Sequence, residues 1–227
     1  MFSVLFEVQP HSDQWEAYLG YAKMLKPELE QIDGFVDNIR YRSLTRDGWL
    51  LSLSNWRDEK ALVRWRTQGM HHGVQEKGRF EVFNDYHLRV GQLTQDTQLP
   101  GGCELRAQRL DETETGDATT VTLINTRRDA DWVKSAQAKE VALALGLQDG
   151  ATGMVSWDVF DAVLSPGDII LLAAWRSHEA ADTFSKSVDF QCVRFRTVRI
   201  VRDYGMYDRR EAPQYYADAQ SPAVTRS

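Results

Sequence analysis

Cysteine is scarce in this chain. Only Cys103 and Cys192 occur among its 227 residues, and they stand far apart in the sequence. Neither belongs to a C-x-x-C pair or to the Cys/His spacing that zinc sites use. We therefore expect free thiols, no structural disulfide and no metal site. Free thiols are typical of the reducing cytoplasm, which is the location we expect.

Long apolar runs and an excess of basic residues are also lacking. No stretch reaches the roughly 18 apolar residues that a membrane-spanning helix needs, and the N-terminus has no basic region ahead of an apolar one. The net charge is −6 and the sequence pI is about 5.4. We expect neither a membrane nor a nucleic-acid partner, because phosphate binding needs a basic face. Phosphate-loop, dinucleotide and serine-nucleophile motifs are lacking as well.

The chain does contain an internal repeat. The segment GWLLSLSNWRDE at Gly48–Glu59 aligns with GDIILLAAWRSH at Gly167–His178. Each has a glycine turn, an apolar strand, Trp-Arg and a helix start. The second copy is about nine residues shorter near its end, where the first copy carries His71 and His72. The repeat predicts two related modules, of which only one keeps the histidine segment.

The first copy is expected to form a β-α-β-β-α-β unit. Apolar residues recur at three- and four-residue steps after Trp15, which predicts a helix with one face against a sheet. An Asp-Gly turn before Trp49 predicts a hairpin. The expected elements are strand 2–8, a helix capped by Ser12 or Asp13 that runs to about Ile32, strands 35–43 and 49–56, a helix capped by Asp58 that runs toward Gln75, and strand 84–92.

The second copy is expected to have the same order of elements. Its strands are expected at 119–126, 154–163, 169–174 and 195–203. Its helices are expected at 131–145 and in a short segment after Trp175-Arg176. The segment between the copies is rich in Gly, Thr, Gln and acidic residues, which is typical of an exposed connector. The expected domains are 1–100 and 118–208, joined by a linker at 101–117 and followed by an arm and a disordered tail at 209–227.

A module of this kind leaves one sheet face uncovered. The strand at 49–56 is apolar on both faces, so a second sheet has to cover the face that the helices do not. Two such sheets packed face to face form a barrel. The partner sheet is expected from the second copy in the same chain, with a homodimer as the alternative.

Four segments between Leu25 and Val90 carry a resemblance to a known family. They are LKPELEQIDGFVDNIRYRSL, LLSLSNWRDEKALVRWR, HHGVQEKGR and DYHLRV, and they resemble antibiotic biosynthesis monooxygenase domains. The resemblance implies an α+β fold of the dimeric α+β barrel type, here built from two tandem ferredoxin-like modules. It also implies a pocket between helices and sheet for an aromatic polyketide, a quinol or, in one branch, haem. The chain is thus expected to be a monooxygenase that oxidises or binds a small aromatic or quinol-like molecule, with no cofactor.

Three residues are the leading catalytic candidates. Trp65 occupies the position at which the haem-degrading branch places a tryptophan, and it has no clear counterpart in the second copy. Asn55 is polar where the second copy has Ala174, so its amide could bind a substrate oxygen or an oxyanion. His72 could act as a base.

Two alternatives stay open. The first is a haem-binding protein with His71, His72 or His87 as the axial ligand. The haem-degrading branch has its ligand histidine about ten residues after the tryptophan, where this chain has Gln75, and an asparagine where it has Glu7. Adjacent helical residues point about 100° apart, so only one of the two neighbouring histidines can face a pocket. The second alternative is a non-catalytic ligand-binding module.

Overall fold

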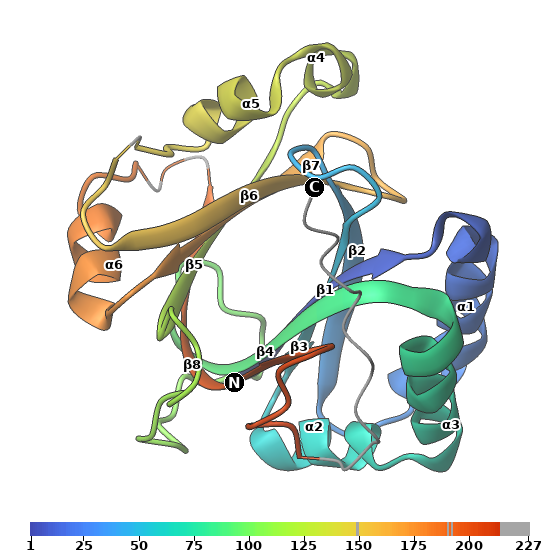
Figure 1. Cartoon of the computed structure of the whole chain (residues 1–227). Helices are drawn as coiled ribbons and strands as arrows, with labels where there is room; N and C mark the ends of the chain where they lie inside the picture. Colours follow the sequence, from blue (N-terminus) through green and yellow to red (C-terminus); the bar gives the residue numbers. More distant parts are fainter. Residues whose placement is uncertain (149, 190, 192, 214–227) are drawn as a thin grey trace, which may run out of the picture.

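The computed structural model describes residues 1–148, 150–189, 191 and 193–213. Cys192 and most of the tail expected to be disordered lie outside the described residues. Within them the chain alternates strands and helices (Figure 1). The strands are β1 (Phe2–Pro10), β2 (Phe35–Ser43), β3 (Leu50–Trp56), β4 (Phe83–Asp96), β5 (Thr120–Arg127), β6 (Met154–Ala162), β7 (Asp168–Trp175) and β8 (Arg194–Gly205).

All eight strands form one closed barrel, in the order β1-β3-β2-β6-β7-β5-β8-β4. The first four strands of the chain are neighbours and so are the last four, and every pairing between neighbours is antiparallel. Two seams join the halves. β4 pairs with β8 from His87 to Asp96, whereas β2 pairs with β6 only from Tyr41 to Ser43. The expectation of an α+β fold whose barrel closes within one chain is confirmed.

Helices cover the outside of the barrel, and each half has its own set (Figure 1). α1 (Trp15–Glu30), α2 (Glu59–Arg66) and α3 (Gly69–Lys77) cover the first half; α4 (Ala130–Ser135), α5 (Ala138–Ala144) and α6 (His178–Ser185) cover the second. Trp56 and Trp175, which match in the repeat, are fully buried under these helices. The barrel interior holds a separate apolar cluster around Leu5, Leu53 and Leu172.

The helix starts and lengths differ from the prediction in three places. Ser12 and Asp13 form a 3-10 turn and do not cap α1 through their side chains. The helix predicted from Asp58 to Gln75 is two helices, because the Gln68 side chain accepts a hydrogen bond from the His71 N–H and starts α3 afresh. The helix predicted at 131–145 also divides, into α4 and α5, where Gln137 and Glu140 form a capping box.

The segment after β4 packs on the barrel more closely than an exposed connector would. The Gln92 side chain accepts hydrogen bonds from the backbone N–H groups of Gln108 and Arg109, at 2.6 and 2.9 Å. Thr113 and Ala118 are buried. The segment therefore acts as a strap along β4 and β8.

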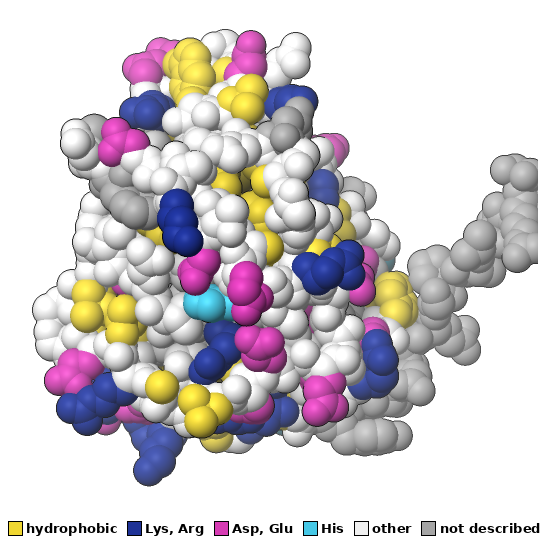
Figure 2. All heavy atoms as spheres, turned by 90° about the vertical axis from the view of Figure 1, so that its left-hand side faces the viewer, with side chains coloured by type: hydrophobic (Ala, Val, Ile, Leu, Met, Phe, Trp, Pro, Cys, Tyr) yellow, Lys and Arg dark blue, Asp and Glu magenta, His cyan; other side chains and the backbone are white. Residues whose placement is uncertain are grey.

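No helix in the described ranges is long and apolar enough to cross a membrane. On the side of the barrel where α6 lies, acidic and basic side chains are interspersed (Figure 2).

A buried ion network ties the two halves together beside the short seam. Glu7 of β1 is 4% exposed and accepts hydrogen bonds from Arg89 and Arg46. Arg46, in the β2–β3 turn, also binds Asp158 of β6, with 2.7 Å between its terminal nitrogen and the carboxylate. Burial alone would raise the pKa of Glu7, but Arg89, Arg46 and His87 together lower it. Arg46 thus links strands of both halves where only three residues of β2 pair with β6.

Replacing Glu7 with Gln should destabilise the protein by about 3 kcal/mol, because two partly or fully buried guanidinium groups lose their shared carboxylate. Urea unfolding followed by circular dichroism at pH 7 measures this. Glu30→Gln is the control: its exposed pair with Lys26, at 3.7 Å, should be worth less than about 0.5 kcal/mol. Equal stability of the two variants would show that the network does not hold the seam.

Candidate functional site

The barrel has two outer layers, one between sheet and helices in each half, and they differ in polarity. In the second half, the β6 and β7 positions that face the helices are Val159, Leu171 and Ala173, all buried and apolar. In the first half, the positions in the same register include Arg40 and Ser52, which pair across β2 and β3. The first layer therefore combines an apolar cluster around Trp56 and Trp65 with polar groups on β2 and β3 that the second layer has replaced by apolar ones.

The polar side chains of the first layer are organised by hydrogen bonds. Asn38 donates to the Ser52 hydroxyl at 3.0 Å and to the Leu53 carbonyl at 3.2 Å. The Trp56 indole N–H donates to the Ser54 hydroxyl at 3.0 Å. These bonds hold the amide and both hydroxyls in place on the sheet surface.

Arg40 is the cation of this layer. Among the described residues it makes no ion pair, and its buried Nε has no hydrogen-bond partner. It lies close to Tyr18 of α1: burial raises the pKa of Tyr18, and the positive charge of Arg40 and a hydrogen bond between the two side chains partly offset that rise. Arg40 is therefore a half-buried guanidinium that can bind a carboxylate from outside the protein.

The helices contribute a histidine stacked on a tryptophan. The rings of His71 and Trp65 are nearly parallel, with 4.1 Å between their centroids and 15° between their planes. His71 Nδ1 lies 3.0 Å from the Trp65 carbonyl oxygen. A carbonyl can only accept, so Nδ1 carries the hydrogen. Burial, the largest influence, lowers the pKa of His71 to about 4. At neutral pH its Nε2 is therefore unprotonated and can accept a proton.

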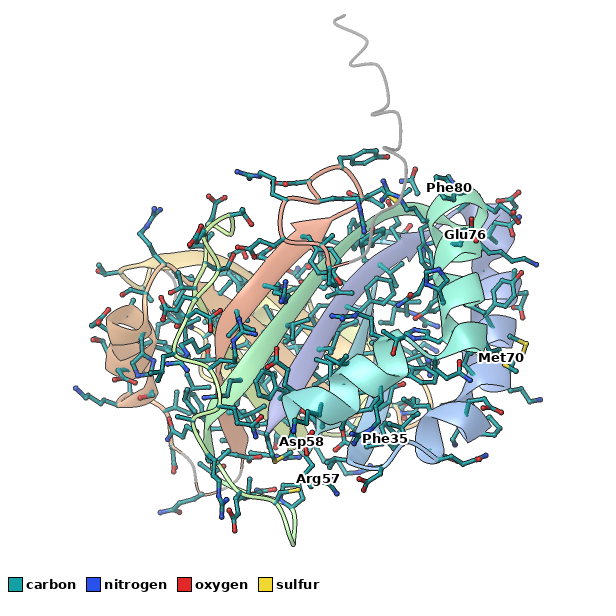
Figure 3. The ribbon with its side chains drawn as sticks, turned by 90° about the horizontal axis from the view of Figure 1, so that it is seen from below. Phe35, Arg57, Asp58, Met70, Glu76 and Phe80 are labelled. Carbon is teal, nitrogen blue, oxygen red and sulfur yellow. The ribbon has the colours of Figure 1, made fainter. Side chains whose placement is uncertain are left out.

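The helix that carries His71 is loosely held. α3 has no fully buried side chain, and Figure 3 shows Met70 and Glu76 on its outer side, where Met70 is 46% exposed. α2, by contrast, is anchored by buried Leu62 and Trp65. α3 is thus the element whose displacement would disrupt the fewest buried contacts.

The structure does not bring all the predicted site residues together. Trp65 and His71 lie in the first layer, and His72 is exposed on the next position of α3. Asn55 faces the other way: it lies on the Leu53 side of β3 and lines a cavity inside the barrel. Its amide nitrogen donates to Asp37 at 2.6 Å.

His87 is remote from both places. It lies at the far mouth of the barrel beside a cavity of about 290 Å³, with 2.6 Å between its Nε2 and an Asp203 carboxylate oxygen. The catalytic roles of Trp65, Asn55 and His72 stay predictions.

The polar face of the first layer was not predicted from the sequence. A period-two pattern could have found it, because β3 reads LLSLSNW and β7 reads DIILLAAW. Alternate positions of β3 are serines where β7 has Leu171 and Ala173. The position of Arg40 next to Tyr18 could not be predicted from such a pattern, because it depends on the packing of α1.

Comparison with known proteins identifies the family. The family model for antibiotic biosynthesis monooxygenase matches residues 1–77. A protein of Pyricularia oryzae named jasmonate monooxygenase ABM is 48% identical over 225 residues, which cover 96% of this chain and 100% of that protein. The chain belongs to the antibiotic biosynthesis monooxygenase family. The residues that the family model matches lie within the first half, which is the half with Arg40, His71 and Trp65.

Solved structures of antibiotic biosynthesis monooxygenase type resemble the chain more loosely. A putative monooxygenase from Lactobacillus acidophilus is 12% identical and has a TM-score of 0.39, covering 89% of this chain and 94% of its own. An anthrone oxidase-like protein is 12% identical with a TM-score of 0.33, covering 94% and 96%. The barrel is therefore defined by the strand pairing of this chain.

Acidification should weaken the fold through His71. The pKa of His71 is lowered from 6.5 to about 4 on folding, so between these values the unfolded chain binds a proton that the folded chain does not. Stability then falls as the pH falls. From pH 7 to pH 5 the wild type should lose roughly 1 to 2 kcal/mol more than His71→Gln. Urea unfolding at both pH values tests this, and His72→Gln, the matched control, should lose as much as the wild type.

Proposed function

We propose that the protein is a monooxygenase that inserts one oxygen atom of O₂ into a small cyclic organic acid of the jasmonate type, bound in the first layer. The observation that carries the proposal is the His71–Trp65 stack, which presents an unprotonated Nε2 in a half-buried place. The full-length similarity to a protein named jasmonate monooxygenase supports the choice of substrate.

The layer offers a role for each part of such a molecule. Jasmonate has a ketone ring, an apolar chain and a carboxylate. Arg40 can bind the carboxylate, and the apolar side chains around Trp65 can hold the ring and chain. His71 can take a proton from a carbon next to the ketone, which makes that carbon electron-rich enough to react with O₂. α3 would move outward to admit the substrate.

The reaction balances with one added reductant. One oxygen atom enters a C–H bond of the substrate, and the other leaves as water with two electrons and two protons. A nicotinamide or ascorbate is the class of reductant that we propose for the two electrons. A quinol substrate would supply the electrons itself, and it is therefore the second substrate class to assay.

We also infer that the chain consists of two tandem ferredoxin-like modules, with domains at 1–100 and 118–208. The support is the strand order, which is β4-β1-β3-β2 in the first half and β8-β5-β7-β6 in the second. The matching tryptophans, Trp56 and Trp175, occupy the same place in each half. In this view only the first module keeps a polar layer.

Replacing His71 with Gln should abolish most of the activity. The variant loses the base but keeps a side chain of similar size, so turnover should fall by roughly 100-fold or more. The assay is mass spectrometry of jasmonate incubated with isotopically heavy O₂ and reductant. His72→Gln should keep wild-type turnover. Loss of activity in His72→Gln with normal activity in His71→Gln would assign the base to His72 and overturn this assignment.

Replacing Arg40 with Met should raise the KM for jasmonate by about 10-fold, because the carboxylate loses an ion pair. The KM for the methyl ester of jasmonate should change by less than about twofold, since the ester has no charge to pair. Arg42→Met is the control: Arg42 is exposed on the same strand and lies over the Trp15 ring at 5.9 Å. Equal effects on acid and ester would exclude carboxylate recognition by Arg40.

A haem-dependent activity is the second candidate. His71 has the donor chemistry of an iron ligand, since it is neutral and its Nδ1–H is fixed by a carbonyl. The cavities of about 360 and 290 Å³ lie elsewhere, and His87 already bonds to Asp203. We place haem second because His71 lines neither of these two cavities in the described part of the chain. A hemin titration that gives a Soret shift in the wild type and in His72→Gln, but not in His71→Gln, would favour it.

A further inference from the structure

The barrel interior is open at one end. A cavity of about 360 Å³ lies where β2 begins and β3 ends, beside the starts of β7 and β8. Its apolar wall includes Ile39, Tyr41 and Leu53. This cavity is on the opposite face of the sheet from His71, so it is separate from the proposed oxygenation site. Its volume is within the range of small-molecule sites.

Most charges around this cavity are paired within the protein. Arg127 binds Asp168 with 2.7 Å between nitrogen and oxygen, and Arg194 binds Asp96 at the same distance. Each pair is neutral as a unit. The remaining charged side chains of the lining are Arg196 and Asp37.

Arg196 is the unusual group. It is 2% exposed, and within the described ranges it makes no ion pair and its Nε has no hydrogen-bond partner. Its guanidinium donates a hydrogen bond to the neutral Asn125 side chain. Burial, followed by the positive charge of Arg194, lowers the pKa of Arg196 to about 10, so it is still charged at pH 7. The negative charges of Asp96 and Asp37, which form no ion pair with it, offset only part of this lowering. A buried cation without a counter-ion destabilises a fold strongly unless a bound anion compensates it.

Asp37 limits what that anion can be. One of its carboxylate oxygens accepts a hydrogen bond from Asn55, whose own oxygen accepts one from Ser3, at 2.6 Å each. This chain orients Asp37 but does not neutralise it. A ligand with two negative charges would face repulsion from Asp37, whereas a ligand with one charge can pair with Arg196 alone.

We propose that this cavity binds a small amphipathic monocarboxylic acid, with its carboxylate on Arg196 and its hydrocarbon part along Ile39, Tyr41 and Leu53. The inference does not depend on the oxygenase reaction, because binding here needs neither O₂ nor His71. Arg196 supplies the charge, Asn55 and Asn125 supply polar contacts, and Asp37 selects against dianions.

Isothermal titration calorimetry with hexanoate in oxygen-free buffer tests the proposal. Hexanoate should bind saturably, and methyl hexanoate and adipate should each bind at least about 10-fold more weakly, because the ester lacks the charge and adipate has one too many. Arg196→Gln should lose hexanoate binding. Asp37→Asn should tighten it by about fivefold or more, since the opposing negative charge is removed.

Two control variants locate the site. Arg127→Gln changes an exposed arginine on the rim that is paired with Asp168, and it should alter hexanoate binding by less than about twofold. His71→Gln should leave hexanoate binding unchanged, whatever its effect on oxygenation. Loss of hexanoate binding in His71→Gln, or binding retained in Arg196→Gln, would overturn the proposal.

Thermal unfolding distinguishes ligand binding from a structural role of Arg196. Removing an uncompensated buried charge should keep or raise the Tm of ligand-free Arg196→Gln. Hexanoate should raise the Tm of the wild type but not that of the variant. A variant that unfolds at a much lower temperature would mean that Arg196 is compensated within the fold, and it would overturn the proposal.

Discussion

The fold depends on closing two sheets into one barrel within a single chain. Each sheet has an apolar face that the helices do not cover, and the two faces bury each other around Leu5, Leu53 and Leu172. The long β4–β8 seam supplies most of the pairing between the halves. At the short seam, Arg46 forms ion pairs with both Glu7 and Asp158. These ion pairs link the two halves where few strand hydrogen bonds do. The covalent link between the halves makes this closure independent of protein concentration.

A barrel of two linked halves can give its outer layers different tasks. In a homodimer both layers have the same sequence, so a polar layer lowers the stability of both halves. Here the second layer, with Val159, Leu171 and Ala173, is free to be a stabilising core. The first layer can then keep Arg40 and the serines of β3, which contribute less to stability.

Strands were predictable from the sequence and helix breaks were not. β2 was predicted at its observed bounds because Gly34, with a φ of 91°, ends the preceding helix and a period-two pattern follows. The break before α3 depends on the Gln68 side chain bonding a backbone N–H, and glutamine is not a usual cap. For the site, the stacking of His71 on Trp65 follows from that break. The sequence could have predicted that Asn55 points into the barrel, away from the helices. Side chains alternate along β3, so Asn55 lies on the same face as Leu53.

The barrel contains two classes of arginine: those that pair with a carboxylate of the protein and those that do not. Arg46 and Arg89 are buried or partly buried and share the carboxylate of Glu7, so their charges serve the fold. Arg196 is 2% exposed and Arg40 is half-buried, and neither forms an ion pair among the described residues. The same guanidinium group thus occurs with and without a counter-ion inside one barrel. Because an uncompensated buried charge lowers stability, we attribute the persistence of Arg196 to an anion that arrives from solution. Arg40 is half-buried, so the same kind of anion reaches it more easily.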